Sequence, residues 1–374
     1  MVAKTSHVVP PPGEAEVRAL KRLPGRLARE GFVDAFVLYG PYNSRSSSWA
    51  QHLPLLPERL RLLFRLFLLG EPVDVDELVR IVPEPEVAAL ERLLVLHRDG
   101  GRIDAGPLAA IPLSGHLVFA DRPCVDPVVY FGEDSAALAA HLSPPSRGEC
   151  LDLCTGPGVQ ALLASSRARR VVAVEINPGS AAYAKLNAVM NDVEDKVDVR
   201  VGDLYGAVPD ESFDFISANP PLLPFPEQLP YPFVGHGGAD GLSITRRIVE
   251  GLPRALRPEG LCQIIGTCSG DERGPACEAE LERTARSLDL DITMTIPSAH
   301  PLEPGAPMFE GLAWSCATAA GLDLGEVRAR FHAHLQGSDT TRIYLFFLAI
   351  SRAARGGRLR VTRHYRAGAG FWFI

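Results

Sequence analysis

Beyond residue 149 the chain alternates between short apolar runs and segments with helical spacing, and this alternation restricts the fold more than any other feature. Apolar runs of this length between turn residues are typical of buried strands. The predicted strands are Glu149–Leu153, Val171–Glu175, Val197–Val201, Phe213–Ala218, Leu261–Thr267, Leu290–Thr295 and Arg342–Ser351. Alternating strands and helices build a mostly parallel sheet covered on both faces. We therefore expect a doubly wound α/β sheet of seven strands, the last one not parallel.

The first 120 residues show a different pattern, so the 374-residue chain is expected to form two domains. Helices are predicted at Glu14–Glu30, Pro57–Leu69, Val73–Val82 and Pro85–His97, followed by strand-like pieces at Gly101–Ile103 and His116–Ala120. The last three of these helices and a small hairpin suggest a winged-helix-like domain over residues 1–120. The remaining domain, 121–374, would hold the sheet, with Pro297–Leu335 inserted as part of a substrate pocket.

The third helix of the winged-helix-like arrangement, Pro85–His97, is a poor candidate for entering a DNA groove. It carries Glu84, Glu86 and Glu91 against only Arg92 and Arg98, whereas DNA contacts depend on basic side chains. We expect a module that covers the substrate or forms a homodimer.

Composition narrows the function further. Hydrophobic residues make up 46% of the chain, which is enough for a packed core, and the net charge of −7 argues against broad phosphate binding. No apolar run reaches the length of a membrane span. No apolar stretch follows Lys4, so the first residues are not expected to be a signal peptide. The seven cysteines are scattered without a C-x-x-C pair. A reduced cytoplasmic protein without metal or membrane is the expectation.

Residues suited to binding a ligand follow the ends of three successive predicted strands. Gly156 and Gly158 follow the first strand and let the backbone approach a ligand closely. Glu175 ends the second strand, where a carboxylate can accept both hydroxyls of a ribose. Asp203 follows the third strand and could accept from an adenine amino group. Their order and spacing predict a nucleoside-containing cofactor. A dinucleotide dehydrogenase is the main competitor, because Ala161 can replace the third glycine of its fingerprint.

The fourth strand decides between these alternatives, because it runs directly into Asn219-Pro220-Pro221. Both prolines fix their own φ angles, and Pro221 also keeps Pro220 extended. The turn is therefore rigid, with the Asn219 amide and the Pro220 carbonyl oxygen able to face one pocket. Two acceptor oxygens can hold the two N–H groups of a planar nitrogen and direct its lone pair at a sulfonium methyl group.

Together these residues resemble the class I S-adenosylmethionine (SAM) dependent methyltransferases of the amino-group branch, which carry an N-P-P-aromatic motif. This branch includes release-factor glutamine, rRNA guanine-N2 and DNA adenine methyltransferases. The resemblance covers about Tyr130 to Ser269 and implies a Rossmann-like fold. It also implies SAM as the cofactor and Asn219 with Pro220 as the catalytic pair. The implied cofactor-binding residues are Tyr130, Asp134, Ser135, Asp152, Gly156, Gly158, Glu175 and Asp203.

Two positions depart from the family pattern. Cys154 stands where the first glycine of the loop is usual, and Leu222 replaces the aromatic residue that stacks on the acceptor. The missing aromatic weakens the case for a nucleobase acceptor, since stacking is a large part of base recognition. The predicted substrate-binding residues are Pro221, Leu222, Tyr231, His236, Asp240 and Glu310.

The sequence thus predicts an N-methyltransferase for an amide, guanidino or amino nitrogen. Because the protein is acidic and lacks the stacking aromatic, a small or amino-acid-like substrate is favoured over a protein glutamine or an rRNA guanine. A non-catalytic SAM-responsive regulator that binds DNA through its winged helix is a further alternative.

Overall fold

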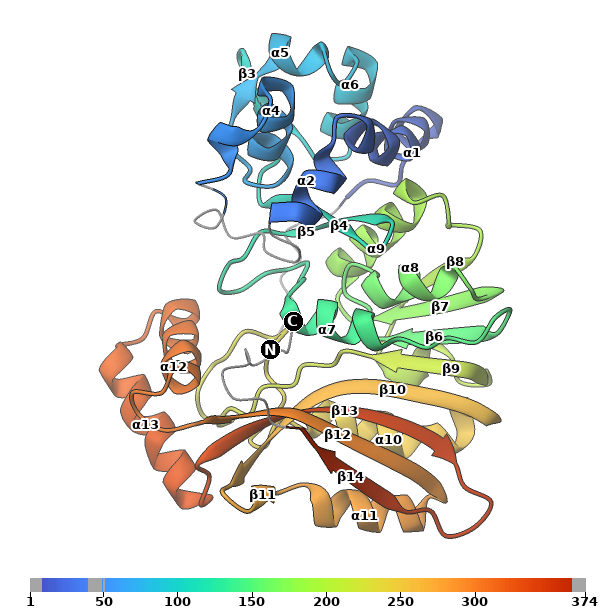
Figure 1. Ribbon diagram of the computed structural model, residues 1–374, viewed down its shortest axis with the longest axis vertical. Coiled ribbons are helices and arrows are strands. Elements are labelled where there is room, and N and C mark those ends of the chain that lie inside the picture. The colour runs from blue at the N-terminus through green and yellow to red at the C-terminus, as the bar shows by residue number, and fades with distance from the viewer. Residues whose placement is uncertain (1–8, 40–48, 50, 365–374) are drawn as a thin grey trace.

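The largest element of the molecule is a sheet of nine strands, ordered β14-β12-β13-β10-β9-β6-β7-β8, with β11 attached to β10. The computed structural model describes residues 9–39, 49 and 51–364, and Figure 1 shows the sheet crossing its lower half. The strands are β6 (Glu149–Leu153), β7 (Arg170–Glu175), β8 (Val197–Val201), β9 (Phe213–Ala218), β10 (Leu256–Asp271), β11 (Gly274–Pro275), β12 (Leu290–Pro301), β13 (Arg342–Arg352) and β14 (Leu359–Arg363).

The seven strands expected from the sequence are all present. Strands β8, β7, β6, β9 and β10 pair in parallel, whereas β13 is antiparallel to both β10 and β12. The predicted Rossmann-like sheet with a non-parallel last strand is therefore confirmed. Strands β11 and β14 were not expected; β14 lengthens the sheet by pairing in parallel with β12.

Helices cover the sheet on both faces, as Figure 1 shows for α8 and α9 on one side and α10 and α11 on the other. Strands buried on two faces need apolar residues at nearly every position, and every residue of β6 and β7 beyond the first is buried. The helices are α7 (Glu133–His141), α8 (Val159–Ser165), α9 (Pro178–Met190), α10 (Ser243–Ala255), α11 (Glu278–Ser287), α12 (Pro307–Ala320) and α13 (Leu324–Gly337), with the 3-10 turn η2 (Leu204–Ala207).

The N-terminal part forms the helical domain expected from the sequence, at the top of Figure 1. Its elements are α1 (Glu14–Arg29), α2 (Phe32–Tyr39), η1 (Leu53–Leu55), α4 (Glu58–Phe67), β1 (Val73–Asp74), α5 (Val75–Val79), α6 (Glu84–Arg92), β2 (His97–Asp99), β3 (Arg102–Asp104), β4 (Leu108–Leu113) and β5 (His116–Asp121). The run from α4 to β3 has the element order of a winged helix.

Three details of this part differ from the sequence expectation. Of the helix predicted at Val73–Val82, Val73–Asp74 form β1 and Val75–Val79 form α5. The helix predicted to reach His97 ends at Arg92, because Leu94 takes a left-handed φ of 57° and the chain turns into β2. The two strand-like pieces also do not pair with each other. Strand β3 lies between β1 and β2, and β5 pairs with β4 in a separate sheet. The proposed boundary at residues 120 and 121 and the proposed insertion at 297–335 stay predictions.

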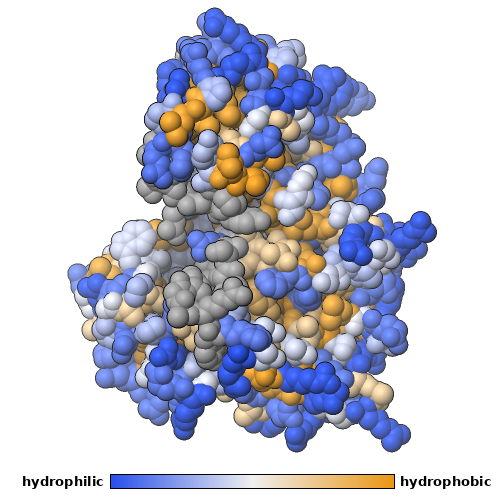
Figure 2. All heavy atoms as spheres, viewed as in Figure 1, coloured by the Kyte–Doolittle hydropathy of each residue, from blue (hydrophilic) through white to orange (hydrophobic). Residues whose placement is uncertain are grey.

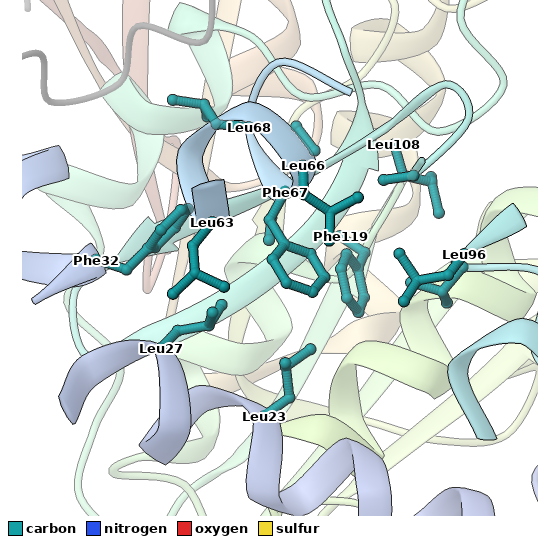
Figure 3. Packing of buried hydrophobic residues seen from close by; sticks show 14 of the residues in the cluster. Leu23, Leu27, Phe32, Leu63, Leu66, Phe67, Leu68, Leu96, Leu108 and Phe119 are labelled. Atoms are coloured by element: carbon teal, nitrogen blue, oxygen red, sulfur yellow. The ribbon is translucent and has the colours of Figure 1, made fainter. Parts of the chain in front are cut away.

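The hydrophobic core of the N-terminal part continues into the part that holds the nine-stranded sheet. Figure 3 shows Leu23 and Leu27 of α1 facing Leu63 and Phe67 of α4, and the same buried cluster includes Tyr183, Leu186 and Met190 of α9. Burial of this apolar surface is the main force that holds the two parts together.

Polar contacts strengthen the same junction. The Asn187 side chain on α9 is fully buried and accepts from the Phe119 N–H at 2.9 Å; it donates to the Phe119 carbonyl at 3.0 Å and to the Pro157 carbonyl at 2.9 Å. Lys21 of α1 forms ion pairs with Asp192 at 2.5 Å and Glu194 at 2.6 Å. Asn187 therefore connects β5 to the glycine turn after β6.

Acidic side chains of α6 are paired within the N-terminal part. Glu86 accepts from Arg26 at 2.9 and 3.0 Å, and Arg98 bonds to both Glu84 and Glu91. The carboxylates of α6, the third helix of the winged-helix-like arrangement, thus hold α1 and β2 in place. This pairing gives the acidic side chains of α6 a structural role.

The outer surface is mostly hydrophilic in the view of Figure 2, and its outline is indented between the N-terminal helices and the α12–α13 region. Over residues 9–39, 49 and 51–364, none of the helices has both the length and the hydrophobicity to cross a bilayer.

We predict that Asn187→Ala lowers the free energy of unfolding by at least about 2 kcal/mol, because it leaves buried Phe119 backbone groups without partners. Urea denaturation followed by circular dichroism measures the change. Lys185→Ala on the exposed face of the same helix is the control and should have no effect. Equal stability of the two variants would contradict the role given to Asn187.

Candidate active site

The carboxyl ends of four parallel strands meet at one edge of the sheet, and the site forms there. In open α/β sheets this edge is where ligands bind. Strands β6, β7, β8 and β9 end at Leu153, Glu175, Val201 and Ala218. Each is followed directly by residues that the sequence predicted as functional.

The turn after β6 brings the backbone close to the ligand space. Cys154, Gly156 and Gly158 all have left-handed φ angles of 57°, 55° and 90°. Such angles favour glycine, and Cys154 adopts one despite its side chain, which identifies the first turn position as the strained one.

Asp152 supports this turn from behind. Its carboxylate is buried and accepts from the Thr155 hydroxyl at 2.5 Å and the Ser217 hydroxyl at 2.8 Å. Burial raises the pKa of Asp152 to about 7. Asp152 therefore ties the turn to β9, and the structure places it behind the cavity wall instead of in direct contact with a ligand.

Glu175 is held in one orientation by two backbone groups. Its Oε2 accepts from the Gly156 N–H at 2.9 Å and its Oε1 from the Asn177 N–H at 2.8 Å. A carboxylate has about four acceptor positions, so both oxygens keep capacity for two further hydroxyl donors. Burial raises the pKa of Glu175, which these hydrogen bonds oppose.

A cavity of 360 Å³ lies over these strand ends. The predicted residues that line it are Tyr130, Ser135, Gly156, Glu175, Asp203, Asn219, Pro221 and His236. Gly158 does not line the cavity; a side-chain carbon added there would lie 3.5 Å from Ala184 Cβ of α9. The cavity thus unites most of the predicted cofactor set with the Asn-Pro-Pro turn.

Arg247 of α10 is a cavity residue that the sequence did not indicate. It donates to Asp203 at 2.7 Å, and both side chains are about half exposed at the cavity mouth. Asp203 is thus already paired with a cation on one oxygen. A single arginine in an amphipathic helix carries no sequence signal, because only the packing of α10 brings it to the end of β8.

Asn219 is fixed by residues of α7. Its Nδ2 donates to Asp134 Oδ2 at 3.0 Å and to Ser135 Oγ at 3.1 Å, and Asp134 Oδ1 accepts from the Tyr130 hydroxyl at 2.7 Å. Both amide hydrogens are therefore used. Asn219 Oδ1 is buried, and no group in the described part of the chain donates to it. A buried acceptor without a partner is costly, so this oxygen is poised for a donor from a ligand.

This network changes the interpretation of the segment before the glycine turn. Tyr130 and Ser135 line the cavity over the strand ends, whereas Asp134 lines a second space and accepts from Asn219. Burial raises the pKa of Asp134, while the hydrogen bonds from Tyr130 and Asn219 lower it. Asp134 therefore holds the Asn219 amide from the side of the second space.

The second space, which we call the acceptor groove, has a volume of 410 Å³. Leu222 and Tyr231, both predicted to contact substrate, lie on its wall together with Asp134. The buried Leu222 side chain is 3% exposed, and its carbonyl oxygen accepts from the Thr267 hydroxyl. The acceptor groove and the cofactor cavity share Tyr130 and Val234, so they adjoin.

Two predicted substrate residues lie outside both spaces. Asp240 is paired with Arg246 of α10 and accepts from the Leu242 N–H, which makes it the anchor of a turn. Glu310 of α12 is paired with Arg328 of α13 and accepts from the Gly305 N–H at 2.9 Å. In both cases a neighbouring arginine satisfies the carboxylate, and no sequence pattern announced that pairing.

Doubly wound topology, an acidic residue closing β7 and Asn-Pro-Pro closing β9 are together typical of SAM-dependent methyltransferases. Residues 130–269 match the methyltransferase small domain family. The chain belongs to this family, and glutamine methyltransferases are among its relatives.

Three curated relatives illustrate the similarity. The release factor glutamine methyltransferase of Mycolicibacterium smegmatis is 34% identical over 49% of this chain and 68% of its own length. The ribosomal protein uL3 glutamine methyltransferase of Bradyrhizobium diazoefficiens is 34% identical over 36% of this chain and 46% of its own. The release factor glutamine methyltransferase of Cereibacter sphaeroides is 34% identical over 42% and 61%, respectively. The chain therefore spans about half to two thirds of these relatives.

The residues of the cavity fit SAM. Glu175 retains acceptor positions for the ribose hydroxyls, Asp203 lies near the cavity mouth, and apolar side chains such as Ile176 and Leu204 line the space between them. The unpartnered Asn219 Oδ1 marks the end at which the methyl group would be transferred.

We predict that Asp152 contributes a loss of stability as the pH rises from about 4 to about 7. An unfolded aspartate has a pKa of about 4, whereas the folded value is about 7. The folded state therefore binds an extra proton in this window and loses that advantage at higher pH. Urea midpoints at pH 5 and pH 8 measure the slope of stability against pH, and Asp152→Asn should lose less stability, or gain more, over this interval than the unmodified protein. An unchanged slope in the variant would refute this assignment.

We also predict that Glu175→Gln weakens the binding of S-adenosylhomocysteine by tenfold or more, since a neutral amide accepts hydroxyl donors less strongly than a carboxylate, by about 1.4 kcal/mol. Isothermal titration calorimetry measures the dissociation constant. Asp240→Asn is the matched control, because Asp240 lies outside the cavity, and its affinity should equal that of the unmodified protein. Weaker binding by Asp240→Asn than by Glu175→Gln would show that the cofactor does not bind in this cavity.

Proposed function

We propose that this protein is an N-methyltransferase that uses SAM to methylate the carboxamide nitrogen of a glutamine residue in a protein. The observation that carries the proposal is the buried Asn219 Oδ1, which has no donor among the described residues although both amide hydrogens of Asn219 are bonded. An oxygen held in this way suits the N–H of a planar amide.

Asn219 and Pro220 are the proposed catalytic residues. The Asn219 Oδ1 and the Pro220 carbonyl oxygen each accept one N–H of the glutamine carboxamide, which holds the nitrogen in one plane and one position. Positioning of this kind is a large part of catalysis when the reacting groups need only to be aligned. SAM, when bound, supplies a methyl group on a positively charged sulfur.

The buried partners of Asn219 strengthen the same contact. Because Asp134 and Ser135 accept from its Nδ2, the amide is polarised and its oxygen becomes a better acceptor. In the reaction the acceptor nitrogen forms a bond to the methyl carbon while the carbon–sulfur bond breaks with its electron pair going to sulfur, and the nitrogen then gives one proton to solvent. Asn219 Oδ1, which accepts an N–H beforehand, orients the nitrogen lone pair toward the methyl carbon until transfer occurs.

The choice of a protein glutamine revises the expectation from sequence, which favoured a small or amino-acid-like substrate. The curated relatives are named for glutamine methylation of a release factor or of ribosomal protein uL3, and this supports the alternative over the main interpretation. The net charge of −7 remains an argument against an rRNA substrate.

We predict that Asn219→Ala reduces methyl transfer by about 10²–10³-fold, because one oriented acceptor of the reacting group is lost. Transfer of a labelled methyl group from SAM to proteins of the source cell, followed by peptide mass spectrometry, measures it. The same variant should bind S-adenosylhomocysteine as well as the unmodified protein.

The mass spectrum distinguishes the substrate classes. A gain of one methyl group on glutamine supports the proposal. Methylation of RNA or of free amino acids in place of protein overturns the substrate, and full activity of Asn219→Ala overturns the mechanism.

A further inference from the structure

The acceptor groove is walled by parts of the chain that lie far apart in sequence. Asp134 and Leu222 mark its inner end beside the Asn219 site, and the segment Pro123–Val125 after β5 forms another wall. The outer wall belongs to α12, through Trp314 and Ser315. The groove therefore extends from the reacting centre to a helix inserted between β12 and β13.

Trp314 is 54% exposed at this wall. A large aromatic ring left open beside a groove is characteristic of a contact residue, because such rings supply much of the energy of protein recognition.

The helix that carries Trp314 is fixed to the loop after Asn-Pro-Pro. Cys316 Sγ donates to the Pro230 carbonyl at 2.9 Å, and a hydrogen bond joins Tyr231 to Ser315. Phe225 of the loop packs on Phe331 of α13 with ring centroids 4.7 Å apart. These contacts fix the position of the Trp314 backbone relative to Asn219. The ring can therefore contact a ligand that enters the groove.

The charged side chains that line the groove restrict which ligands it can bind. Of the described residues that line it, Asp134 is the sole acidic one and none is lysine or arginine. A phosphate backbone would need cations there, and so would the carboxylate of a free amino acid, because a buried charge needs a partner. An uncharged stretch of polypeptide needs neither.

We infer that the acceptor groove binds an uncharged polypeptide segment on either side of the methylated glutamine, with Trp314 as the specificity-determining residue. This inference rests on the proposed function for the identity of the glutamine. It assigns the recognition of flanking residues to α12, outside the region that matches the methyltransferase family.

The test compares three probes by calorimetry on protein saturated with S-adenosylhomocysteine. The probes are a blocked pentapeptide with a central glutamine between alanines, N-acetylglutamine methylamide, and free glutamine. The unmodified protein should bind the pentapeptide at least tenfold more tightly than the methylamide, and free glutamine most weakly.

Trp314→Ala should raise the dissociation constant of the pentapeptide about tenfold, the usual order for loss of an aromatic contact residue. It should leave that of the methylamide unchanged, and Trp314→Phe should retain most of the affinity. Thr318→Ala, one turn further along the exposed face of α12, is the matched control and should behave like the unmodified protein.

Methyl transfer measured in parallel separates the two proposals. Pentapeptide binding that depends on Trp314, without methylation of glutamine, would overturn the proposed function and keep the groove. Methylation of glutamine with equal pentapeptide affinity in Trp314→Ala would overturn the role given to the groove and leave the proposed function standing. Free glutamine binding as tightly as the pentapeptide would also overturn it.

Discussion

The hydrogen bonds from the Asn219 amide to Asp134 and Ser135 connect the end of β9 to the start of α7, and the chemistry of the site depends on them. An asparagine side chain offers two donors and one acceptor oxygen. When both donors are used within the protein, only the oxygen is left for a ligand, and its direction is set. Tyr130 adds a further restraint, since its hydroxyl donates to the other oxygen of Asp134. A flexible asparagine would present either end to the acceptor; this one presents only its oxygen.

The cofactor side is supported by a similar arrangement of buried polar groups. Asp152 ties the turn after β6 to β9, and Asn187 ties the same turn to β5 of the N-terminal part. Each of these groups would destabilise the fold if its partners were removed, because buried polar atoms must be paired. The N-terminal part therefore stabilises the cofactor turn through α9, as well as sharing a hydrophobic core with it.

The acceptor side is assembled from segments that are distant in sequence. The loop after Asn219 packs on α12 and α13 through Phe225 and Phe331, and α7 contributes Asp134. This division explains a general feature of the site: the cofactor residues follow one another at strand ends, whereas the acceptor wall requires an insertion more than 80 residues further along the chain. The cofactor residues can thereby be combined with a separate surface for the substrate.

What the sequence alone determined was local. The strand pattern predicted the Rossmann-like sheet, and the glycines, Glu175 and Asn219 stood at the ends of strands, where parallel pairing must bring them together. Long-range contacts decided the rest. Asp240 and Glu310 had the same acidic character as Glu175, but packing of α10 and α13 supplied Arg246 and Arg328 to neutralise them. Arg247 and Trp314 reach the two spaces only through the folding of their helices onto the sheet and the loop. Periodicity identifies which face of a helix is buried; it does not identify the residue that the other face will meet.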